Sequence, residues 1–469
     1  MALSTIEVDY LVVGAGATAL AFVDSMLAKP DATFAIVDRR ARPGGHWNDA
    51  YPFVRLHQPS TAYGVNSTEL GDGSVDDVGL NKGLRELASG IEVLDYFDRL
   101  MQRRFLPSGR VRYFPMSEQS VDADGTHCAT SLTSGKSRRF NVHKKVVNAT
   151  HAGTSIPSTH LRSYAVADGI ECIPPNALPR LGRPHRQYVV VGGGKTAMDT
   201  CLWLLQNDVE PSQIQWIVPR DAWLLDRANL QSGPEFRGAF LASVAQQFRA
   251  IACAGTLAEL YQELETRGQL VRLDRTVTPT MYHCATLSQL ELAELRRIHD
   301  VVRMGHVRSV EVDRIILDAG ETNKEQDALI VDCSARGLRP IEGLQVFDGV
   351  TVNILQVRIC SPCFSAALIG HVESQFEDEA EKNMLCRPVP VPMVPSDYVR
   401  MWAVTLLNGS HWSKHSNIES WIADSRLDSG SRTIRGLTKD DNAMQLLLQD
   451  YRASVRPAVE NLPRLLAQI

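Results

Sequence analysis

The chain has 469 residues, of which 44% are hydrophobic and 22% charged, and its formal net charge is −5. This length exceeds one ordinary core, so two or three globular domains are expected. The charge balance lacks the polybasic signature of proteins that bind nucleic acid or anionic membranes, and no apolar run approaches the roughly 18 to 20 residues of a membrane span.

The cysteines and the start of the chain bear on the cellular compartment. The nine cysteines follow no framework of spacings, so most of them are expected to be reduced and buried. The first predicted strand begins almost at Met1, which leaves no space for a signal or transit peptide. A cytoplasmic protein is therefore expected.

A glycine-rich turn between a strand and a helix stands near the start of the chain. The apolar run Val8–Val13 predicts a buried strand, the motif GAGATA occupies positions 14–19, and positions 20–28 have helical spacing. In this context the glycines allow a tight turn and close approach of a pyrophosphate, which the helix N-terminus then faces. A second strand, Phe34–Val37, leads to a carboxylate that can bind ribose hydroxyls. The predicted dinucleotide contacts are Gly14, Gly16, Ala19, Asp38 and Arg39.

A second copy of this pattern stands in the middle of the chain. The strand Gln187–Val191 leads into GGGKTA at 192–197, and a helix is expected over 197–206. The next strand, Ile214–Val218, is followed by Arg220 where an acid would select NADH, so NADPH is favoured unless this arginine pairs with Asp221. Lys195 either adds charge near the pyrophosphate or is a solvated surface residue. The predicted contacts are Gly192, Gly194, Lys195, Thr196, Ala197 and Arg220.

The segment after Asp38 carries a specific resemblance. It contains PGGHW at 43–47, then Tyr51-Pro52, then a polar loop to Ser67. This order is similar to the flavin-side signature of the flavin-containing monooxygenases and Baeyer–Villiger monooxygenases, in the superfamily of flavoproteins with two dinucleotide-binding domains. The resemblance covers roughly residues 5 to 375 and implies FAD at the first site and NADPH at the second. It adds Gly45, His46 and Trp47 as FAD contacts.

One segment departs from the family pattern. These monooxygenases usually carry F-x-G-x-x-x-H shortly before the second glycine motif, and here positions 153–164 keep only His160 and Tyr164 in a similar arrangement. The chain therefore resembles a divergent relative. The departure concerns the oxygenation step and leaves both nucleotide sites untouched.

Two further strands resemble the crossings between the domains of this superfamily. The run 146–151, which includes Thr150 as an FAD contact, resembles the exit from the FAD domain, and 329–337 resembles the return strand. The predicted fold is α/β, with two Rossmann-like dinucleotide-binding domains, the NADPH domain inserted into the FAD domain, and a helical C-terminal tail. The predicted boundaries are 1–183 and 329–390 for the FAD domain, 184–328 for the NADPH domain and 391–469 for the tail.

The catalytic candidates lie in the polar loop. In flavin-containing monooxygenases an Asn-Ser pair lies on the substrate side of the flavin, and Asn66-Ser67 matches it, although an asparagine can equally cap a turn. Arg55 could stabilise an anionic flavin species, and His57 could supply a proton. Either side chain could instead be a structural partner of Asp49 or of a backbone carbonyl.

The last third of the chain contributes a helix and a tail. Residues 361–366 open a helix whose N-terminus, in this superfamily, points at the flavin pyrimidine edge, and the alternative is an ordinary core helix. Cys360 and Cys363 have dithiol spacing but are expected to be incidental thiols, and no metal site is expected. Tail tryptophans, such as Trp402, belong to a substrate lid, a dimer surface or the core. The predicted FAD contacts in this region are Ser361, Phe364 and Ser365.

These features predict an FAD-dependent, NADPH-using oxidoreductase. The resemblance implies a monooxygenase that oxygenates a small organic substrate with O₂ through a C4a-(hydro)peroxyflavin. One alternative is an NADPH-dependent flavoprotein reductase or dehydrogenase with a non-oxygen acceptor, and another is a non-catalytic redox-sensing nucleotide-binding protein. A homodimer is expected, because it is the commonest oligomeric state of proteins that assemble.

Overall fold

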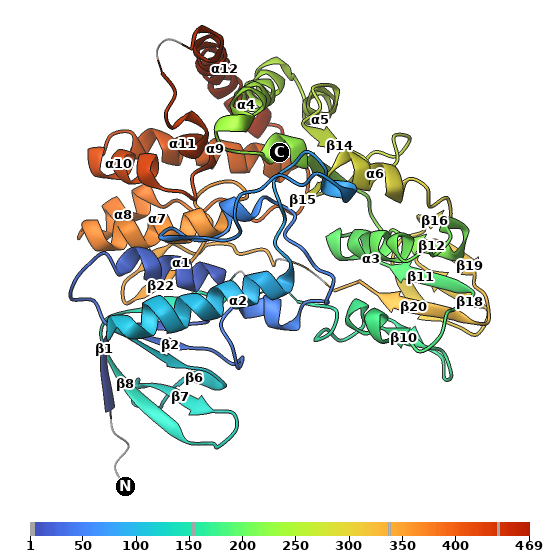
Figure 1. The fold of residues 1–469 in the computed structure, drawn as a ribbon, viewed down its shortest axis with the longest axis horizontal. Coiled ribbons are helices and arrows are strands. Elements are labelled where there is room, and N and C mark those ends of the chain that lie inside the picture. The colour runs from blue at the N-terminus through green and yellow to red at the C-terminus, as the bar shows by residue number, and fades with distance from the viewer. Residues whose placement is uncertain (1–4, 152, 154, 336, 338, 439–440) are drawn as a thin grey trace.

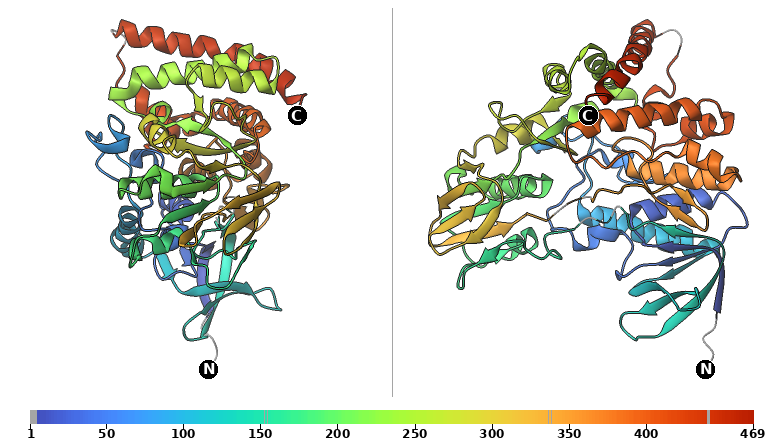
Figure 2. Two further views of the ribbon diagram at one scale, coloured as in Figure 1. Left: turned by 90° about the vertical axis from the view of Figure 1, so that its right-hand side faces the viewer. Right: turned by 180° about the vertical axis from the view of Figure 1, so that it is seen from behind.

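The structure is a computed structural model that describes residues 5–151, 153, 155–335, 337, 339–438 and 441–469. Thr154, in the segment that departs from the family pattern, and Arg336, in the predicted return strand, lie outside the described residues. The chain forms two sheet-containing lobes with a layer of helices above them (Figure 1). Figure 2 shows the same lobes from the side and from behind.

The first lobe is built on a mostly parallel sheet. In sheet order its strands are β21 (Phe347–Asp348), β22 (Thr351–Asn353), β8 (Ser137–Asn148), β1 (Thr5–Val13), β2 (Phe34–Val37) and β5 (Val111–Phe114), and the antiparallel hairpin of β6 (Ser117–Val121) and β7 (His127–Ser131) joins β8. Side chains alternate along β1, so Tyr10 and Val12 belong to the helix-side core while Leu11 belongs to the core under the hairpin. The helices of this lobe are α1 (Ala17–Met26), α2 (Gly90–Leu100) and α7 (Pro362–Gln375).

The second lobe is built on a parallel sheet. In sheet order its strands are β10 (Cys172–Ile173), β20 (Ala328–Asp332), β11 (Gln187–Val191), β12 (Ile214–Ile217) and β16 (Val301–Val302). One face packs on α3 (Lys195–Gln206) and α6 (Gln289–Leu295). The other face packs on a second sheet of β19 (Gly320–Asn323), β18 (Arg314–Leu317), β17 (Val307–Val310) and β9 (Ala165–Val166).

A long insertion between β12 and β16 and the C-terminal tail form the helical layer. The insertion contains the sheet β14 (Leu270–Val271), β13 (Ala222–Asp226) and β15 (Met281–Leu287), together with α4 (Arg237–Cys253) and α5 (Leu257–Thr266). After α8 (Glu379–Leu385), the tail contributes α9 (Ser396–Trp412), α10 (Ser416–Asp424), α11 (Ser429–Ile434) and α12 (Asn442–Leu466). In all three views of Figures 1 and 2, α12 lies along α4, so the tail packs on the insertion.

Most predicted elements of the two nucleotide units are confirmed, and the boundaries between the lobes need correction. The strand at 328–332 pairs with β11, so it belongs to the second lobe and does not begin the returning part of the first. Strands β9 and β10 also pair with strands of the second lobe, although they precede residue 184. The second lobe therefore begins near residue 165, and the first resumes at β21. Local sequence patterns do not indicate these strand pairings, because the paired strands are far apart in the sequence.

The tail helices depend on contacts with distant parts of the chain. Helix α9 runs through Asn408-Gly409, and the buried Asn408 amide donates to the carbonyls of Val357 (2.8 Å) and Arg387 (2.9 Å). Helix α12 is one continuous helix of 25 residues. Helix α10 begins at Ser416 without a side-chain cap.

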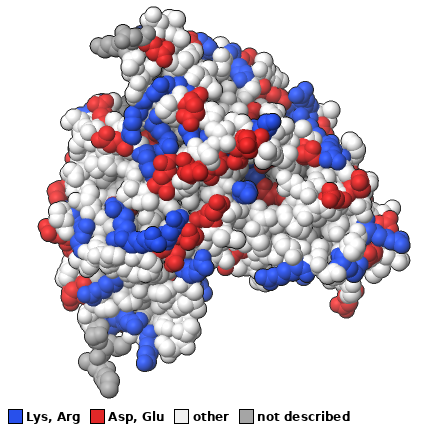
Figure 3. All heavy atoms as spheres, viewed as in Figure 1, with Lys and Arg blue, Asp and Glu red and all other residues white. Residues whose placement is uncertain are grey.

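Within the described residues, no helix combines the length and apolarity needed to cross a membrane. On the face drawn in Figure 3, lysines and arginines alternate with aspartates and glutamates. This mixed surface agrees with the small net charge of the chain.

Close packing of α1 on α7 yields a stability prediction. A Cβ on Gly370 would lie 2.7 Å from the backbone oxygen of Phe22, whereas one on Gly409 in α9 would meet nothing within 4 Å. Gly370→Ala is expected to destabilise the protein by about 1–3 kcal/mol through overpacking. Gly409→Ala is the control and should be neutral or stabilising, because alanine favours helix. Urea unfolding followed by circular dichroism measures both, and equal stabilities would contradict the packing described.

Candidate functional site

The first glycine turn brings two backbone segments into close approach. Gly14 has φ +100° and lies between β1 and α1, and a Cβ on Gly45 would lie 3.0 Å from the Cα of Gly16. Helix α1 begins without a side-chain cap, so its first N–H groups are available to an anion. Ala19 is fully buried, as close packing of helix on strand requires. The turn has the backbone form that a pyrophosphate site needs.

A carboxylate and a phenol stand together beside this turn. Buried Asp38 accepts hydrogen bonds from the backbone N–H groups of Ala15 (2.6 Å) and Arg40 (2.7 Å). On the neighbouring strand, the hydroxyl of Tyr113 is buried without a hydrogen-bond partner in the described part of the chain. Burial and the charge of Asp38 raise the pKa of Tyr113. The free hydroxyl of Tyr113 and the carboxylate of Asp38, an acid of the kind that binds ribose hydroxyls, fit a bound nucleotide. Arg39 instead extends outward and pairs with Glu118 at 3.4 Å.

The resemblance-based contacts of the first site occupy different environments. Trp47 is buried and donates to the hydroxyl of Tyr63 (2.8 Å). His46 is half-buried, and burial together with Arg40 lowers its pKa to about 4, so it is neutral at physiological pH. Thr150 lies directly beside Gly14, because its methyl group would be 3.7 Å from a Cβ at that glycine. Thr150 thus lies at the turn, whereas Trp47 is part of the core.

The second glycine turn is more crowded. Gly192 has φ +137°, and a Cβ there would lie 2.7 Å from the carbonyl oxygen of Cys333. A Cβ on Gly193 would lie 2.8 Å from the carbonyl oxygen of Arg220. The Arg220 side chain is exposed, and the alternative that it pairs with Asp221 is wrong, since Asp221 binds Arg303 at 2.9 Å. The guanidinium of Arg220 therefore remains available at the end of β12.

The helix after this turn is tied to the first lobe. Lys195 forms an ion pair with Asp199 one turn further along α3, and Asp199 also accepts a hydrogen bond from the hydroxyl of Tyr51 (2.6 Å). Burial and the charge of Asp199 raise the pKa of Tyr51. Lys195 is thus neither a freely solvated residue nor directed solely at a phosphate. Within α3, Gly194 is the N-cap, Thr196 lies in the first turn and Ala197 is buried.

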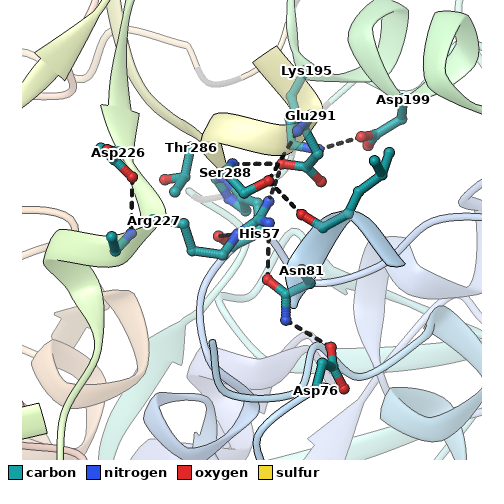
Figure 4. A network of polar contacts seen from close by, with 12 residues as sticks. His57, Asp76, Asn81, Lys195, Asp199, Asp226, Arg227, Thr286, Ser288 and Glu291 are labelled. Carbon is teal, nitrogen blue, oxygen red and sulfur yellow. Dashed lines mark hydrogen bonds and ion pairs between the residues drawn. The ribbon is translucent and has the colours of Figure 1, made fainter. Parts of the chain in front are cut away.

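A fully buried arginine joins the two lobes and the insertion. Arg227 follows β13 and donates to Glu291 (2.7 Å), to the amide oxygen of Asn81 (3.0 Å) and to the carbonyl of His57 (3.1 Å). Glu291 also forms the capping box of α6 with Ser288. Figure 4 shows how these groups converge near Lys195. We call the set His57, Asn81, Lys195, Arg227 and Glu291 the interdomain seam.

His57 is half-buried in this seam and is a neutral imidazole. Desolvation lowers the pKa of His57 to about 3, and the nearby charges of Lys195 and Arg227 contribute. Its Nδ1 atom is buried without a hydrogen-bond partner in the described chain. A ring that is neutral at pH 7 disfavours the predicted role of His57 as a proton donor. The ring can still donate or accept one hydrogen bond.

The two other catalytic candidates are engaged with groups of the protein. Arg55 is exposed and donates to the carbonyl of Leu87 (2.9 Å), as the structural alternative expects. Asn66 accepts hydrogen bonds from Ser425 (2.8 Å) and the backbone of Arg426 (3.1 Å), both in the tail. Their catalytic roles stay predictions.

The Asn-Ser pair lies beside the C-terminal part of α1. Ser67 binds Asp24, which lies eight residues beyond Gly16 and therefore about 12 Å along the helix axis at 1.5 Å per residue. The pair is thus at the end of α1 remote from the glycine turn. It anchors the tail on the first lobe.

The start of α7 uses its predicted side chains internally. The hydroxyl of Ser365 accepts from the backbone N–H groups of Val357 (3.1 Å) and Arg358 (3.3 Å), and Phe364 lies under the Arg358 guanidinium, 3.8 Å from the ring centre. Ser361 donates to the carbonyl of Ile359. The helix begins where predicted. Because these side chains are engaged within the protein, the backbone N–H groups are the donors that remain for a ligand.

The cysteine prediction needs one correction. Cys360 forms a disulfide with Cys284 and is not an incidental thiol, whereas Cys363 stays free and burial raises its pKa to about 11. In the described residues, His, Cys, Asp and Glu side chains form no group of three that could hold a metal ion.

The tail tryptophans pack against other parts of the fold. Trp412 is buried and donates to the carbonyl of Leu385 (2.7 Å), and Trp421 stacks on His371 with ring centres 5.1 Å apart. Trp402 packs edge-on against Phe248 of α4. The tail therefore braces both lobes.

Sequence reasoning missed a cavity at the edge of the second lobe. Its volume is about 520 Å³, and its walls carry arginine and histidine side chains over an apolar floor. The lining includes Leu273, Arg275, Leu295, Arg296, His299 and Arg303. None of the predicted site residues belongs to this lining, and no motif marks it.

Comparison with known proteins defines the class of fold. No protein-family profile matches the chain. A polycyclic ketone monooxygenase from the thermophilic fungus Thermothelomyces thermophila is similar in structure, with a TM-score of 0.51, 13% identity, and coverage of 97% of this chain and 89% of that chain. The chain thus has the fold of the flavoprotein monooxygenases, which confirms the predicted fold class.

The comparison of sequences identifies the family. Uncharacterized proteins of Mycobacterium bovis and Mycobacterium tuberculosis are each 44% identical to this chain over 462 residues, which cover 98% of this chain and 85% of each relative. The chain belongs to the same family as these mycobacterial proteins.

The interdomain seam predicts a large effect of one carboxylate. Glu291→Ala leaves the buried Arg227 without its counter-charge, which is expected to destabilise the protein by about 3–5 kcal/mol. Glu294→Ala, on the same helix, removes only the surface pair with Arg297 and should change stability by about 0.5 kcal/mol or less. Urea midpoints compare the two, and similar losses would contradict the role of Arg227.

His57 predicts a pH dependence of stability. Its folded pKa of about 3 lies below the unfolded value of about 6.5, so the unfolded chain binds more protons and stability falls as the pH drops below 6.5. His57→Gln removes this group and should flatten the decline between pH 6.5 and pH 4.5 relative to the exposed-site control His143→Gln. Urea midpoints at several pH values measure the slopes. Parallel profiles for the two variants would contradict a neutral His57.

Proposed function

We propose that the protein is an FAD-dependent oxidoreductase that uses NADPH. The observation that carries the proposal is the pair of glycine turns, each at the carboxyl end of a parallel sheet, each with a glycine at positive φ and each with a close approach of two backbone segments. Backbone N–H groups and uncapped helix starts at both turns suit two pyrophosphates. The interdomain seam holds the two lobes in contact, which an electron transfer between two nucleotides requires.

FAD fits the first site on the chemistry of its residues. The backbone at Gly14, Gly16 and Gly45 would hold the pyrophosphate, and Asp38 and Tyr113 would bind the adenosine end. When bound, FAD supplies a ring that accepts hydride and passes electrons to an acceptor. The protein's own part is to bind the cofactor, orient it and exclude water.

NADPH fits the second site. The backbone at 192–194 and the start of α3 would hold its pyrophosphate, and Arg220 would bind the 2′-phosphate. His57 and Tyr51 belong to the surface where the lobes meet, and both are uncharged there. The free Nδ1 atom of His57 offers a hydrogen bond that would help to position the nicotinamide carboxamide.

A monooxygenase with a small organic substrate and O₂ is the finer form of this proposal. It is supported by the PGGHW and Tyr-Pro segments and by the fold shared with a polycyclic ketone monooxygenase. The hydrogen bonds of Arg55 and Asn66 to other groups of the protein support the alternative of a reductase with a non-oxygen acceptor. The assembly, for which a homodimer is expected, stays a prediction.

Nucleotide selectivity tests the second site. Arg220→Ala should weaken NADPH binding on the order of tenfold or more and leave NADH binding unchanged, because only NADPH offers a phosphate to the guanidinium. The control Arg308→Ala removes an exposed arginine of β17, which pairs with Asp318. Quenching of tryptophan fluorescence gives the dissociation constants. Equal losses for NADPH and NADH would contradict the assignment.

The fate of oxygen separates the two forms of the proposal. Purified protein is mixed with NADPH and O₂ in the presence of a panel of ketones, sulfides and amines. A monooxygenase consumes NADPH and O₂ in equal amounts and forms an oxygenated product with little hydrogen peroxide. NADPH consumption that needs a quinone or other non-oxygen acceptor would support the reductase, and no consumption with any acceptor would contradict both.

A further inference from the structure

A disulfide crosses from the insertion to the first lobe. Cys284 lies on β15, and Cys360 lies 76 residues further along the chain, in the loop between β22 and α7, with a Cα–Cα distance of 6.4 Å. The seven other cysteines are free, and five of them are buried. The chain therefore uses its disulfide at a boundary between two parts of the fold.

The location of this disulfide connects it with the interdomain seam. The amide of Gln58, next to His57, approaches the carbonyl of Cys360 at 3.5 Å. The backbone N–H of Ile359 donates to Thr405 of α9 (2.9 Å), so the tail also reaches this loop. Around Cys284 are buried aromatic rings of the insertion and the tail, including Tyr282 and Tyr398. The bond thus lies where the first lobe, the insertion and the tail meet.

The backbone at both cysteines favours a reversible bond. Cys284 has φ +54° and Cys360 has φ +47°, in the left-handed region that non-glycine residues rarely adopt. The crosslink holds both residues in this region, and its removal frees each to relax. Cys284 is buried while Cys360 is half-buried, so a thiol from solution reaches Cys360 more readily.

We infer that Cys284 and Cys360 form a redox-sensitive site, a disulfide that locks the insertion to the first lobe when oxidised and releases it when reduced by a dithiol. In the reduction, a thiolate of the dithiol attacks the Cys360 sulfur, the Cys284–Cys360 bond breaks, and Cys284 leaves as a thiolate that takes up a proton. The second thiol of the reductant then displaces Cys360, which leaves as a thiol. Two electrons and two protons pass to the protein, and the dithiol becomes a disulfide.

Release should loosen the two segments that the bond joins. With the disulfide intact, β15 and residues 354–361 are held together covalently. After reduction they depend on non-covalent contacts that run through the segment before α9, since the backbone N–H of Tyr282 donates to the carbonyl of Met393 (3.4 Å) and that of Val389 donates to the carbonyl of Gln356 (2.7 Å). The redox state of the cysteines therefore determines how far the insertion can move relative to the first lobe. This inference does not depend on the proposed cofactors.

Mass spectrometry and hydrogen exchange test the inference on the full chain as purified without reductant. Free thiols are blocked with N-ethylmaleimide before digestion, and a crosslinked peptide pair containing Cys284 and Cys360 is expected. Hydrogen exchange is then compared with and without dithiothreitol, and exchange several-fold faster is expected in β15 and in 354–361 after reduction. The thermal midpoint should fall by a few degrees at the same time.

Three variants separate the lock from a general effect of the reductant. Cys284→Ser and Cys360→Ser should show the reduced behaviour from the start and should not respond to dithiothreitol, whereas Cys253→Ser, at an exposed free cysteine, should behave as wild type. The wild-type comparison alone still tests the inference if a variant fails to fold. Nine blocked thiols, a Cys360–Cys363 crosslink, or a disulfide whose reduction leaves hydrogen exchange unchanged would each overturn it.

Discussion

The buried guanidinium of Arg227 is the interaction on which the arrangement of the two lobes depends. Its five N–H donors reach a carboxylate of the insertion, an amide of the first lobe and the backbone beside His57. An unpaired charge at this depth would be strongly unfavourable, so the three segments have to meet in one geometry for the charge to be compensated. That geometry also places Lys195 and α3 against the loop that carries Tyr51. The two glycine turns can therefore serve a common site only while this network is intact.

The tail and the insertion extend this constraint over the helical layer. Helix α12 packs along α4 of the insertion, while Ser425 and Arg426 bind Asn66 of the first lobe. The tail thus connects parts of the fold that the chain order separates. The disulfide between Cys284 and Cys360 adds a covalent link at the same meeting point. A change in any of these contacts is expected to act on the relative position of the lobes before it acts on either glycine turn.

Local sequence patterns could predict both nucleotide-binding units, because strand, glycine turn and helix are contiguous there. The exposed Arg220 and the buried Asp38 follow from the same short-range pattern. The hydrogen-bond partners of the catalytic candidates could not be predicted, because these partners lie far away along the chain. Asn66 matched a family motif, yet its amide oxygen is engaged by tail residues about 360 positions away. Likewise, nothing near His57 in the sequence signals that Lys195 and Arg227 lie beside it.

The central claim is that the first glycine turn binds FAD, and the absorption spectrum of the freshly purified protein tests it most directly. The account predicts the visible bands of oxidised flavin at a stoichiometry near one per chain, and release of FAD on denaturation. It also predicts that Gly45→Val, which forces a side chain against Gly16, yields a folded but largely colourless protein. A folded wild-type protein that is colourless and does not take up added FAD would contradict the account.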